Sequence, residues 1–347
     1  MKTKLVMLVF VLIISACSSK NTYTVIEDQS GNDRSFDGIV DIINKDGNTN
    51  VLFIHGMSGY AKLDDEKPID PCTVINSVRA KFGLSAGDFQ YPDLHCSDTF
   101  NVDDKTVHLM SMHWSDVTSF QKLQLNAIDQ QSSFDEKRLD ITKQAKYGLV
   151  NDGFADALMY TGSYKDLVLK RIIDQYKRIQ ETNPADKVII VTFSLGSSIF
   201  IDSLERLNQT GEQDLLKGKI QMVYMMANQV PLIDLATSDV NNKPEVVPQT
   251  YETISPYLSN SIDKSNDKVR FVAFSDPNDL LSYPLDSERM GDLKGDYVNV
   301  IAPVADKTYY VPFFKKFSIV NYKNAHLAYV YSEPIMKLLL DGYKTEE

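Results

Sequence analysis

The sequence lacks several features that mark particular protein classes. Its formal net charge is −11, and it has no stripe of Lys and Arg, which nucleic-acid binding requires for the neutralisation of phosphates. Internal repeats and low-complexity blocks are missing, and so are a Gly-rich phosphate loop and a dinucleotide-binding fingerprint. Only three cysteines and one tryptophan are present. We therefore expect no nucleic-acid partner and no cofactor.

The overall composition is that of an ordinary soluble globular protein. Apolar residues make up 43% and charged residues 24% of the chain. Its 347 residues are enough for one large domain or two small ones. Short apolar runs alternate with helical patterns along the sequence. We expect strands at 50–56, 106–114, 187–193, 219–227, 268–274 and 317–322, and helices at 73–83, 164–180 and 333–342. After Ser194, a further helical pattern includes Phe200, Leu204 and Leu207 and ends at Gly211.

Strands that are apolar along their whole length favour a parallel sheet covered by helices on both faces. The predicted fold class is therefore α/β, with a mostly parallel, doubly wound sheet in one domain at 32–347. Two stretches, 115–162 and 228–267, do not fit the simple alternation. Long insertions of this kind are often lids or binding loops, and mere decoration of the domain is the alternative.

The first residues have the pattern of an export signal. Lys2 and Lys4 precede an apolar run at 5–14, which is too short to span a bilayer comfortably. The run ends in Ile14-Ser15-Ala16-Cys17, which resembles the lipobox of bacterial lipoproteins. The resemblance implies a signal peptide at 1–16, cleavage before Cys17, a diacylglyceryl group on its sulfur and an acylated amino end. An uncleaved anchor and a plain signal peptide are the alternatives.

The same resemblance suggests where the protein resides. Residues 17–31 are polar and are predicted to be a tether. Ser18 and Ser19 follow the cysteine where an acidic residue could stand, a pattern that resembles sorting to the outer rather than the inner membrane. Export places Cys72 and Cys96 in an oxidising compartment, where two cysteines tend to form a disulfide. A reactive thiol is the alternative, but no known thiol-enzyme motif surrounds either cysteine.

A strand that ends on a serine is the strongest catalytic signal. The apolar run from Val188 ends in Thr192-Phe193-Ser194-Leu195-Gly196, and a helical pattern follows. A sharp strand-to-helix turn raises a serine hydroxyl above the sheet, and the turn requires small residues on either side. The segment resembles the nucleophile elbow of α/β-hydrolases. Gly196 satisfies that pattern, whereas Thr192 stands where the family usually has glycine.

The upstream pair His55-Gly56 ends another predicted strand, as the oxyanion loop does in α/β-hydrolases. The resemblance implies that the backbone N–H groups of Met57 and Leu195 bind the developing oxyanion. A plain Gly-containing turn is the alternative.

The family's chain order is serine, acid, histidine. His326 is the only histidine after Ser194, so the resemblance makes it the catalytic base. Asp279, which precedes two leucines, is the expected acid, and Asp276 is the alternative. A zinc site at His108 and His113 is not expected, because side chains five residues apart on a strand face opposite sides.

These residues predict a serine hydrolase that cleaves a carboxylic ester of an acyl or lipid-like substrate and reaches the membrane through its lipid anchor. An acyltransferase or amidase with the same triad is one alternative. A non-catalytic binding protein of the cell envelope is another. Trp114 and Phe120 are expected in the core, with an acyl pocket as the alternative.

Overall fold

A computed structural model describes residues 23–26, 35–57, 72–87, 96–131, 136–237, 253–258, 270–285, 297–304, 309–310, 318–319 and 322–344. The predicted signal peptide, the lipidation site at Cys17 and most of the tether lie outside the described residues. Where the tether is described, Thr24–Ile26 form an edge strand of the main sheet, so this part of the prediction was wrong. So does much of the second predicted insertion, because 238–252 and 259–269 are not described.

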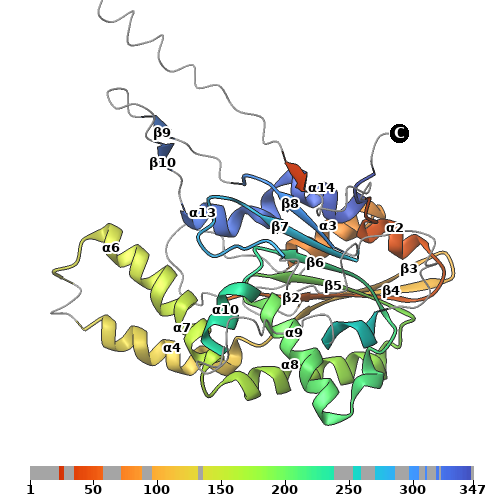
Figure 1. The fold of residues 1–347 in the computed structure, drawn as a ribbon, viewed down its shortest axis with the longest axis horizontal. Coiled ribbons are helices and arrows are strands. Elements are labelled where there is room, and N and C mark those ends of the chain that lie inside the picture. Colours follow the sequence, from red (N-terminus) through yellow and green to blue (C-terminus); the bar gives the residue numbers. More distant parts are fainter. Residues whose placement is uncertain are drawn as a thin grey trace, which may run out of the picture.

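The centre of the molecule is one eight-stranded, mostly parallel sheet (Figure 1). Its strand order is β1-β8-β7-β6-β5-β2-β4-β3. The pairs from β4 to β8 are parallel, whereas the two edge strands, β1 and β3, run antiparallel to their neighbours. The strands are β1 (Thr24–Ile26), β2 (Thr49–Ile54), β3 (Ser97–Val102), β4 (Lys105–Met112), β5 (Lys187–Phe193), β6 (Ile220–Met226), β7 (Phe271–Ser275) and β8 (Tyr297–Ile301).

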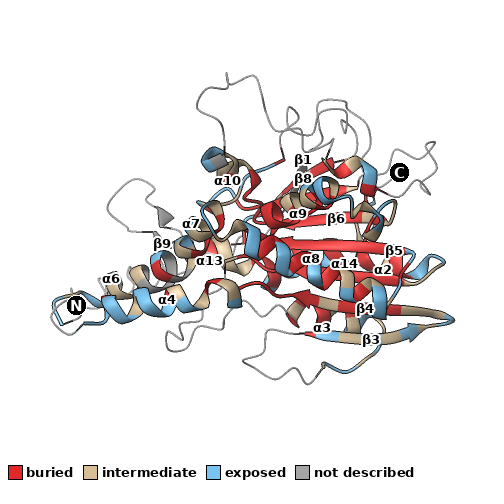
Figure 2. Ribbon diagram, turned by 90° about the horizontal axis from the view of Figure 1, so that it is seen from below, coloured by how far each residue is buried: buried red, intermediate tan, exposed pale blue. Residues whose placement is uncertain are grey.

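Helices cover both faces of the sheet, so the predicted α/β class is confirmed. Successive side chains of a strand point to opposite faces, and the central strands supply two cores in this way. Ile189 and Val191 of β5 pack with α2 (Ile39–Asn44), α3 (Cys72–Lys81) and α14 (Glu333–Asp341). Val188 and Ile190 pack with α8 (Lys165–Thr182) and α9 (Gly196–Thr210) on the other face. Figure 1 shows the sheet between the two helix layers, and Figure 2 shows that its central strands are buried.

The first insertion forms a helical arm, defined here as residues 116–161. It contains α4 (Asp116–Asp129), α6 (Asp140–Ala145), the π-helix η1 (Lys146–Phe154) and α7 (Ala155–Thr161). Both views show α4 and α6 extending away from the sheet, at the end where α13 (Tyr322–Leu327) also lies (Figures 1 and 2). Within the described part of the chain, no helix combines the length and the apolar character needed to cross a membrane.

The sequence patterns mislocated the last strand. The segment predicted at 317–322 contributes only Ser318–Ile319 (β10), which pairs with Tyr309–Tyr310 (β9) in a separate two-stranded sheet. The main sheet instead continues with β8, whose apolar run is short and is interrupted by Asn299. Edge strand β3 was also missed, because its side chains are only partly buried and mostly polar.

Cys72 and Cys96 lie at disulfide distance, with Cα atoms 5.4 Å apart. The pair joins the first residue of α3 to the residue before β3. It therefore connects a helix on one face of the sheet to the edge strand, across a loop that includes the undescribed residues 88–95.

Candidate active site

Ser194 occupies a sharp turn between β5 and α9. Its φ is +54°, in the left-handed region that non-glycine residues rarely adopt. The Ser194 N–H donates to the carbonyl of Met226 at 2.8 Å. A Cβ atom on Gly196 would lie 2.3 Å from the carbonyl oxygen of Ile54. The turn thus passes so close to β2 that only glycine fits at position 196.

Thr192 stands where the α/β-hydrolase pattern usually has glycine. It is still part of β5 and is fully buried. Its Oγ1 lies 2.9 Å from the hydroxyl oxygen of Ser197, in the first turn of α9. The threonine therefore joins the end of the strand to the start of the helix. A β-branched residue is suited to an extended strand position, so the departure from glycine creates no strain at Thr192.

Ser194, His326 and Asp279 form a continuous hydrogen-bonded chain. His326 Nε2 is 3.0 Å from Ser194 Oγ, and its Nδ1 is 2.9 Å from each carboxylate oxygen of Asp279. Since a carboxylate can only accept, Nδ1 carries the ring proton and Nε2 is left to accept from the serine hydroxyl. Positions 194 and 326 are 132 residues apart in sequence, so only the fold brings these groups together.

Asp276 has a different environment from Asp279. Its carboxylate accepts the backbone N–H of Val304 at 2.7 Å and that of Asn278 at 2.8 Å. It thus orders the turn after β7 and the segment after β8. Asp279 is the carboxylate that faces the histidine, and its side chain is fully buried.

Tyr329 was not singled out from the sequence, yet its hydroxyl contacts the loop that carries both acids. It donates to Asp279 Oδ2 at 3.0 Å and accepts the N–H of Asp276 at 2.7 Å. Burial, and then the negative charge of Asp279, raise the pKa of Tyr329 well above its usual value, so the phenol keeps its proton. Tyr329 follows His326 by three residues, and this helical spacing is the signal that could have identified it.

The carboxyl end of β2 lies directly beside the serine. A Cβ atom on Gly56 would lie 2.6 Å from Ser194 Cβ, so this glycine permits the close approach. His55 Nδ1 donates to the Gly56 carbonyl at 2.7 Å. In a trans peptide the carbonyl and the next N–H point in opposite directions. The Met57 N–H therefore points away from the ring of His55.

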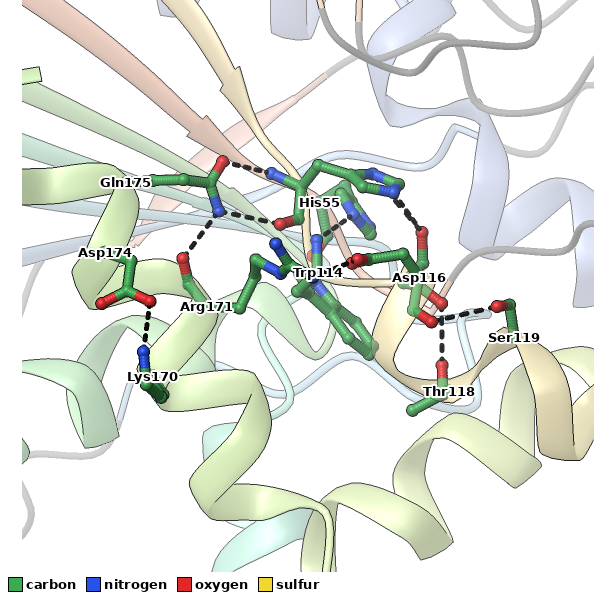
Figure 3. A network of polar contacts seen from close by, with 11 residues as sticks. His55, Trp114, Asp116, Thr118, Ser119, Lys170, Arg171, Asp174 and Gln175 are labelled. Atoms are coloured by element: carbon green, nitrogen blue, oxygen red, sulfur yellow. Dashed lines mark hydrogen bonds and ion pairs between the residues drawn. The ribbon is translucent and has the colours of Figure 1, made fainter. Parts of the chain in front are cut away.

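A polar network fixes the His55 ring (Figure 3). The ring stacks on Trp114 with centroids 5.1 Å apart, and the indole N–H donates to the His55 carbonyl at 3.0 Å. Gln175 of α8 then holds His113: its Oε1 accepts the His113 N–H at 2.9 Å and its Nε2 donates to the His113 carbonyl at 2.8 Å. Trp114 is fully buried, as predicted. Its ring packs against His55, next to the proposed oxyanion loop.

His108 and His113 belong to no metal site within the described residues. His108 on β4 shares a hydrogen bond of 2.6 Å with Thr99 on β3, and burial lowers its pKa. Over the ranges described, no group of three or more His, Cys, Asp or Glu side chains could hold a metal ion.

Access to the site differs among its three residues. Ser194 is fully buried, whereas the His326 side chain is 12% exposed. The ring of Phe193 lies 5.4 Å from that of His326. Of Ser194, His326 and Asp279, His326 is thus the residue that is partly exposed at the protein surface.

No model of a known protein family matches the chain, and no curated protein matches it in sequence. The geometry of the site is therefore the basis for a functional proposal.

Proposed function

We propose that the protein is a serine hydrolase that cleaves a carboxylic ester through an acyl-enzyme. The observation that carries the proposal is the chain Ser194–His326–Asp279, with separations of 3.0 Å and 2.9 Å. Three residues that are distant in sequence meet at one edge of a parallel sheet, where such sheets bind ligands. The positive φ of the serine and the close approach of Gly196 to β2 support the same proposal.

The proposed chemistry follows from the proton positions. His326 Nε2 accepts the proton of Ser194 as its Oγ attacks the ester carbonyl, and then protonates the leaving alkoxide. Asp279 holds the ring in the required tautomer and stabilises the imidazolium. A water molecule, activated by the same nitrogen, then releases the acid and regenerates the serine.

The oxyanion would form between the two glycine-containing turns. We propose the N–H groups of Met57 and Leu195 as its donors, each worth about 3–4 kcal/mol in the transition state. Two observations support this proposal: Gly56 lies against Ser194 Cβ, and the His55 bond to the Gly56 carbonyl fixes the peptide that carries the Met57 N–H.

These features together support membership of the α/β-hydrolase fold. The serine follows β5, the acid follows β7 and the histidine follows β8, which is the family's order along the chain. An acyltransferase or amidase would use the same groups with another acceptor or leaving group. A product assay with water alone, and with added alcohol or amine acceptors, separates these reactions.

A fluorophosphonate probe tests the central claim, because it phosphonylates only an activated serine. The probe is expected to label the wild type and to spare Ser194→Ala. The matched control is Ser198→Ala, since Ser198 is also buried and lies four residues away on α9. Labelling that persists in Ser194→Ala removes this serine from the mechanism. A folded wild type that does not react favours the non-catalytic envelope protein.

The acyl specificity requires a second assay. Nitrophenyl esters of increasing chain length distinguish an esterase, which prefers short chains, from a lipase. Ser194 is fully buried, so entry of any ester requires movement of the side chains above it. We therefore expect bulky probes to react more slowly than small ones.

We also propose that the protein is a lipoprotein of the bacterial envelope, anchored through Cys17 in the outer rather than the inner membrane. The support is the sequence Ile14-Ser15-Ala16-Cys17 after an apolar run. Incorporation of labelled palmitate is expected in the wild type and not in Cys17→Ser. Equal incorporation in the two proteins would exclude the anchor.

A further inference from the structure

Helix α4 of the arm exposes apolar side chains and buries polar ones. At about 100° per residue, Phe120, Leu123 and Ile128 share an arc of about 140°, and they are 62%, 62% and 64% exposed. The opposite side of the helix presents Thr118, Lys122 and Asp129, all buried. A helix on the surface of a soluble protein has the opposite arrangement, with its apolar side toward the core.

The buried side of α4 is held by charged and polar contacts. Lys122, only 2% exposed, pairs with Asp156 of α7 at 3.0 Å. The other oxygen of Asp156 accepts the Thr118 hydroxyl at 2.7 Å. At the far end, Asp129 is paired with Arg138 through two hydrogen bonds of 2.8 and 2.9 Å. The bonds from Arg138 lower the pKa of Asp129, so this carboxylate stays charged.

The exposed side of α4 carries one charged group, that of its first residue Asp116, and this carboxylate is paired with Arg171 of α8. After Asp116 the only charged residues of the helix are Lys122 and Asp129, and both are buried. The same arm also exposes Leu139, Val150, Phe154 and Leu158. Isolated exposed apolar residues are normal on a monomer, but this arm exposes many of them.

We propose that this outer face of α4 inserts into the hydrocarbon boundary of a lipid surface. Ion pairs inside and apolar groups outside are the arrangement expected of helices in an apolar medium. There, apolar contact between helices has no hydrophobic advantage, and polar contacts hold them together. In water the same arrangement exposes the surface that folding normally buries.

Two further observations favour a lipid surface over a second copy of the chain. The net charge of −11 opposes association between copies, whereas neutral hydrocarbon does not repel the chain. The predicted lipid anchor, Cys17, lies six residues before Tyr23, where the described chain begins. Such an anchor would hold Tyr23 within about 20 Å of a bilayer, so the protein would already lie beside a lipid surface.

The first test measures how deeply positions on the arm enter the bilayer. The variant Leu123→Cys is produced as the full chain, processed by the cell, and its new cysteine is labelled with an environment-sensitive fluorophore. The labelled protein is then mixed with phosphatidylcholine vesicles. The matched control is Leu167→Cys on α8. Leu167 is 53% exposed but lies beside charged Asp166, Lys170 and Arg171. Lipids with quenchers in their acyl chains are expected to quench the label at 123 and not the label at 167.

The second test measures affinity without the anchor, in the chain that starts at Ser18 and keeps every described residue. The double variant Leu123→Gln, Ile128→Gln changes only exposed positions to a residue that also favours helices. It is expected to bind vesicles at least about tenfold more weakly, and Leu167→Gln is expected to bind as the wild type does. Binding should not weaken at high salt, because the one carboxylate on the face, that of Asp116, is already paired with Arg171.

Several outcomes would overturn the proposal. One is a label at 123 that stays in water while the chain floats with vesicles, and another is a chain that does not float. Binding that requires anionic lipid and is lost in salt would identify an electrostatic contact instead. Protection of position 123 that grows with protein concentration, without lipid quenching, would identify a second copy as the occupant. Ser194→Ala is expected to leave the depth unchanged, so this inference and the proposed hydrolase activity can fail separately.

Discussion

Tyr329→Phe separates the positioning of Asp279 from the general stability of the fold. The substitution removes one oxygen atom and leaves the ring in place. That oxygen donates to Asp279 at 3.0 Å and accepts the Asp276 N–H at 2.7 Å. Without it, Asp279 keeps its contacts to His326 and to the Leu281 N–H, but its Oδ2 loses one of two neighbouring donors.

The expected loss of stability follows from these two bonds. A hydrogen bond to a charged group contributes about 1.5–3 kcal/mol, and an unsatisfied buried N–H costs about 1–3 kcal/mol. The two terms share one atom and do not add fully. We therefore expect the free energy of unfolding to fall by about 2–4 kcal/mol, measured by urea denaturation.

The catalytic effect requires a separate measurement and a matched control. The rate of fluorophosphonate labelling of Ser194, measured well below the unfolding transition, is expected to fall about tenfold, the effect of about 1.4 kcal/mol in the barrier. The control is Tyr257→Phe. The hydroxyl of Tyr257 is buried in the other core and also makes two hydrogen bonds, to the Leu204 carbonyl at 2.9 Å and to Asn208 at 2.8 Å.

The comparison of the two variants decides the role of Tyr329. Tyr257→Phe should lose similar stability and keep the wild-type labelling rate. If both variants slow labelling equally, or if neither does, Tyr329 does not position the acid and its hydroxyl has only a structural role.

Three further predictions concern stability. Gly196→Ala places a Cβ atom 2.3 Å from the Ile54 carbonyl and should cost more than about 3 kcal/mol in urea denaturation; a neutral result would show that the turn can move. Burial lowers the pKa of Lys187 to about 8, so between pH 8 and 10 the unfolded chain binds more protons than the folded protein does. The free energy of unfolding should therefore rise with pH over this range, by about 1–2 kcal/mol more than in Lys187→Met after allowance for solvent screening. A flat difference across that pH range would refute this. Replacing both Cys72 and Cys96 by Ser opens a loop with a sequence separation of 24 and should cost about 3.5 kcal/mol; reductant should have no effect on that variant.

The central sheet was predictable because its strands are buried on both faces. Sequences such as that of β5, in which all seven positions are buried, have too few polar residues for a sheet with one face in water. The amphipathic pattern of α8 likewise located a helix that packs with one side on the sheet. The chain positions of Ser194, Asp279 and His326 could be selected because the resemblance to α/β-hydrolases implies the order serine, acid, histidine.

The arm could not be predicted in the same way. Sequence patterns assume that apolar side chains face the core, and on α4 this assumption places Phe120 inside. The structure instead buries Lys122 against Asp156 and exposes Phe120. The prediction that Phe120 belongs to the core was therefore wrong. The cause is a partner from another helix, since the carboxylate of Asp156 makes the burial of a lysine tolerable.

Thr192 shows why the glycine pattern of a serine turn need not be met residue by residue. The pattern exists because a tight turn brings backbones together, so glycine is required only where another chain segment arrives. Here β2 passes close to Gly196, where a Cβ atom would lie 2.3 Å from the Ile54 carbonyl oxygen. Gly56 lies close to Ser194, and a Cβ atom on it would be 2.6 Å from Ser194 Cβ. The positive φ falls on Ser194 itself, which leaves Thr192 in the extended backbone that β-branched residues favour. Its hydroxyl bond to Ser197 then fastens the strand to the helix. The close approach that the serine needs is thus provided by Gly56 and Gly196, from two different strand ends, so the first glycine of the usual pattern is not required here.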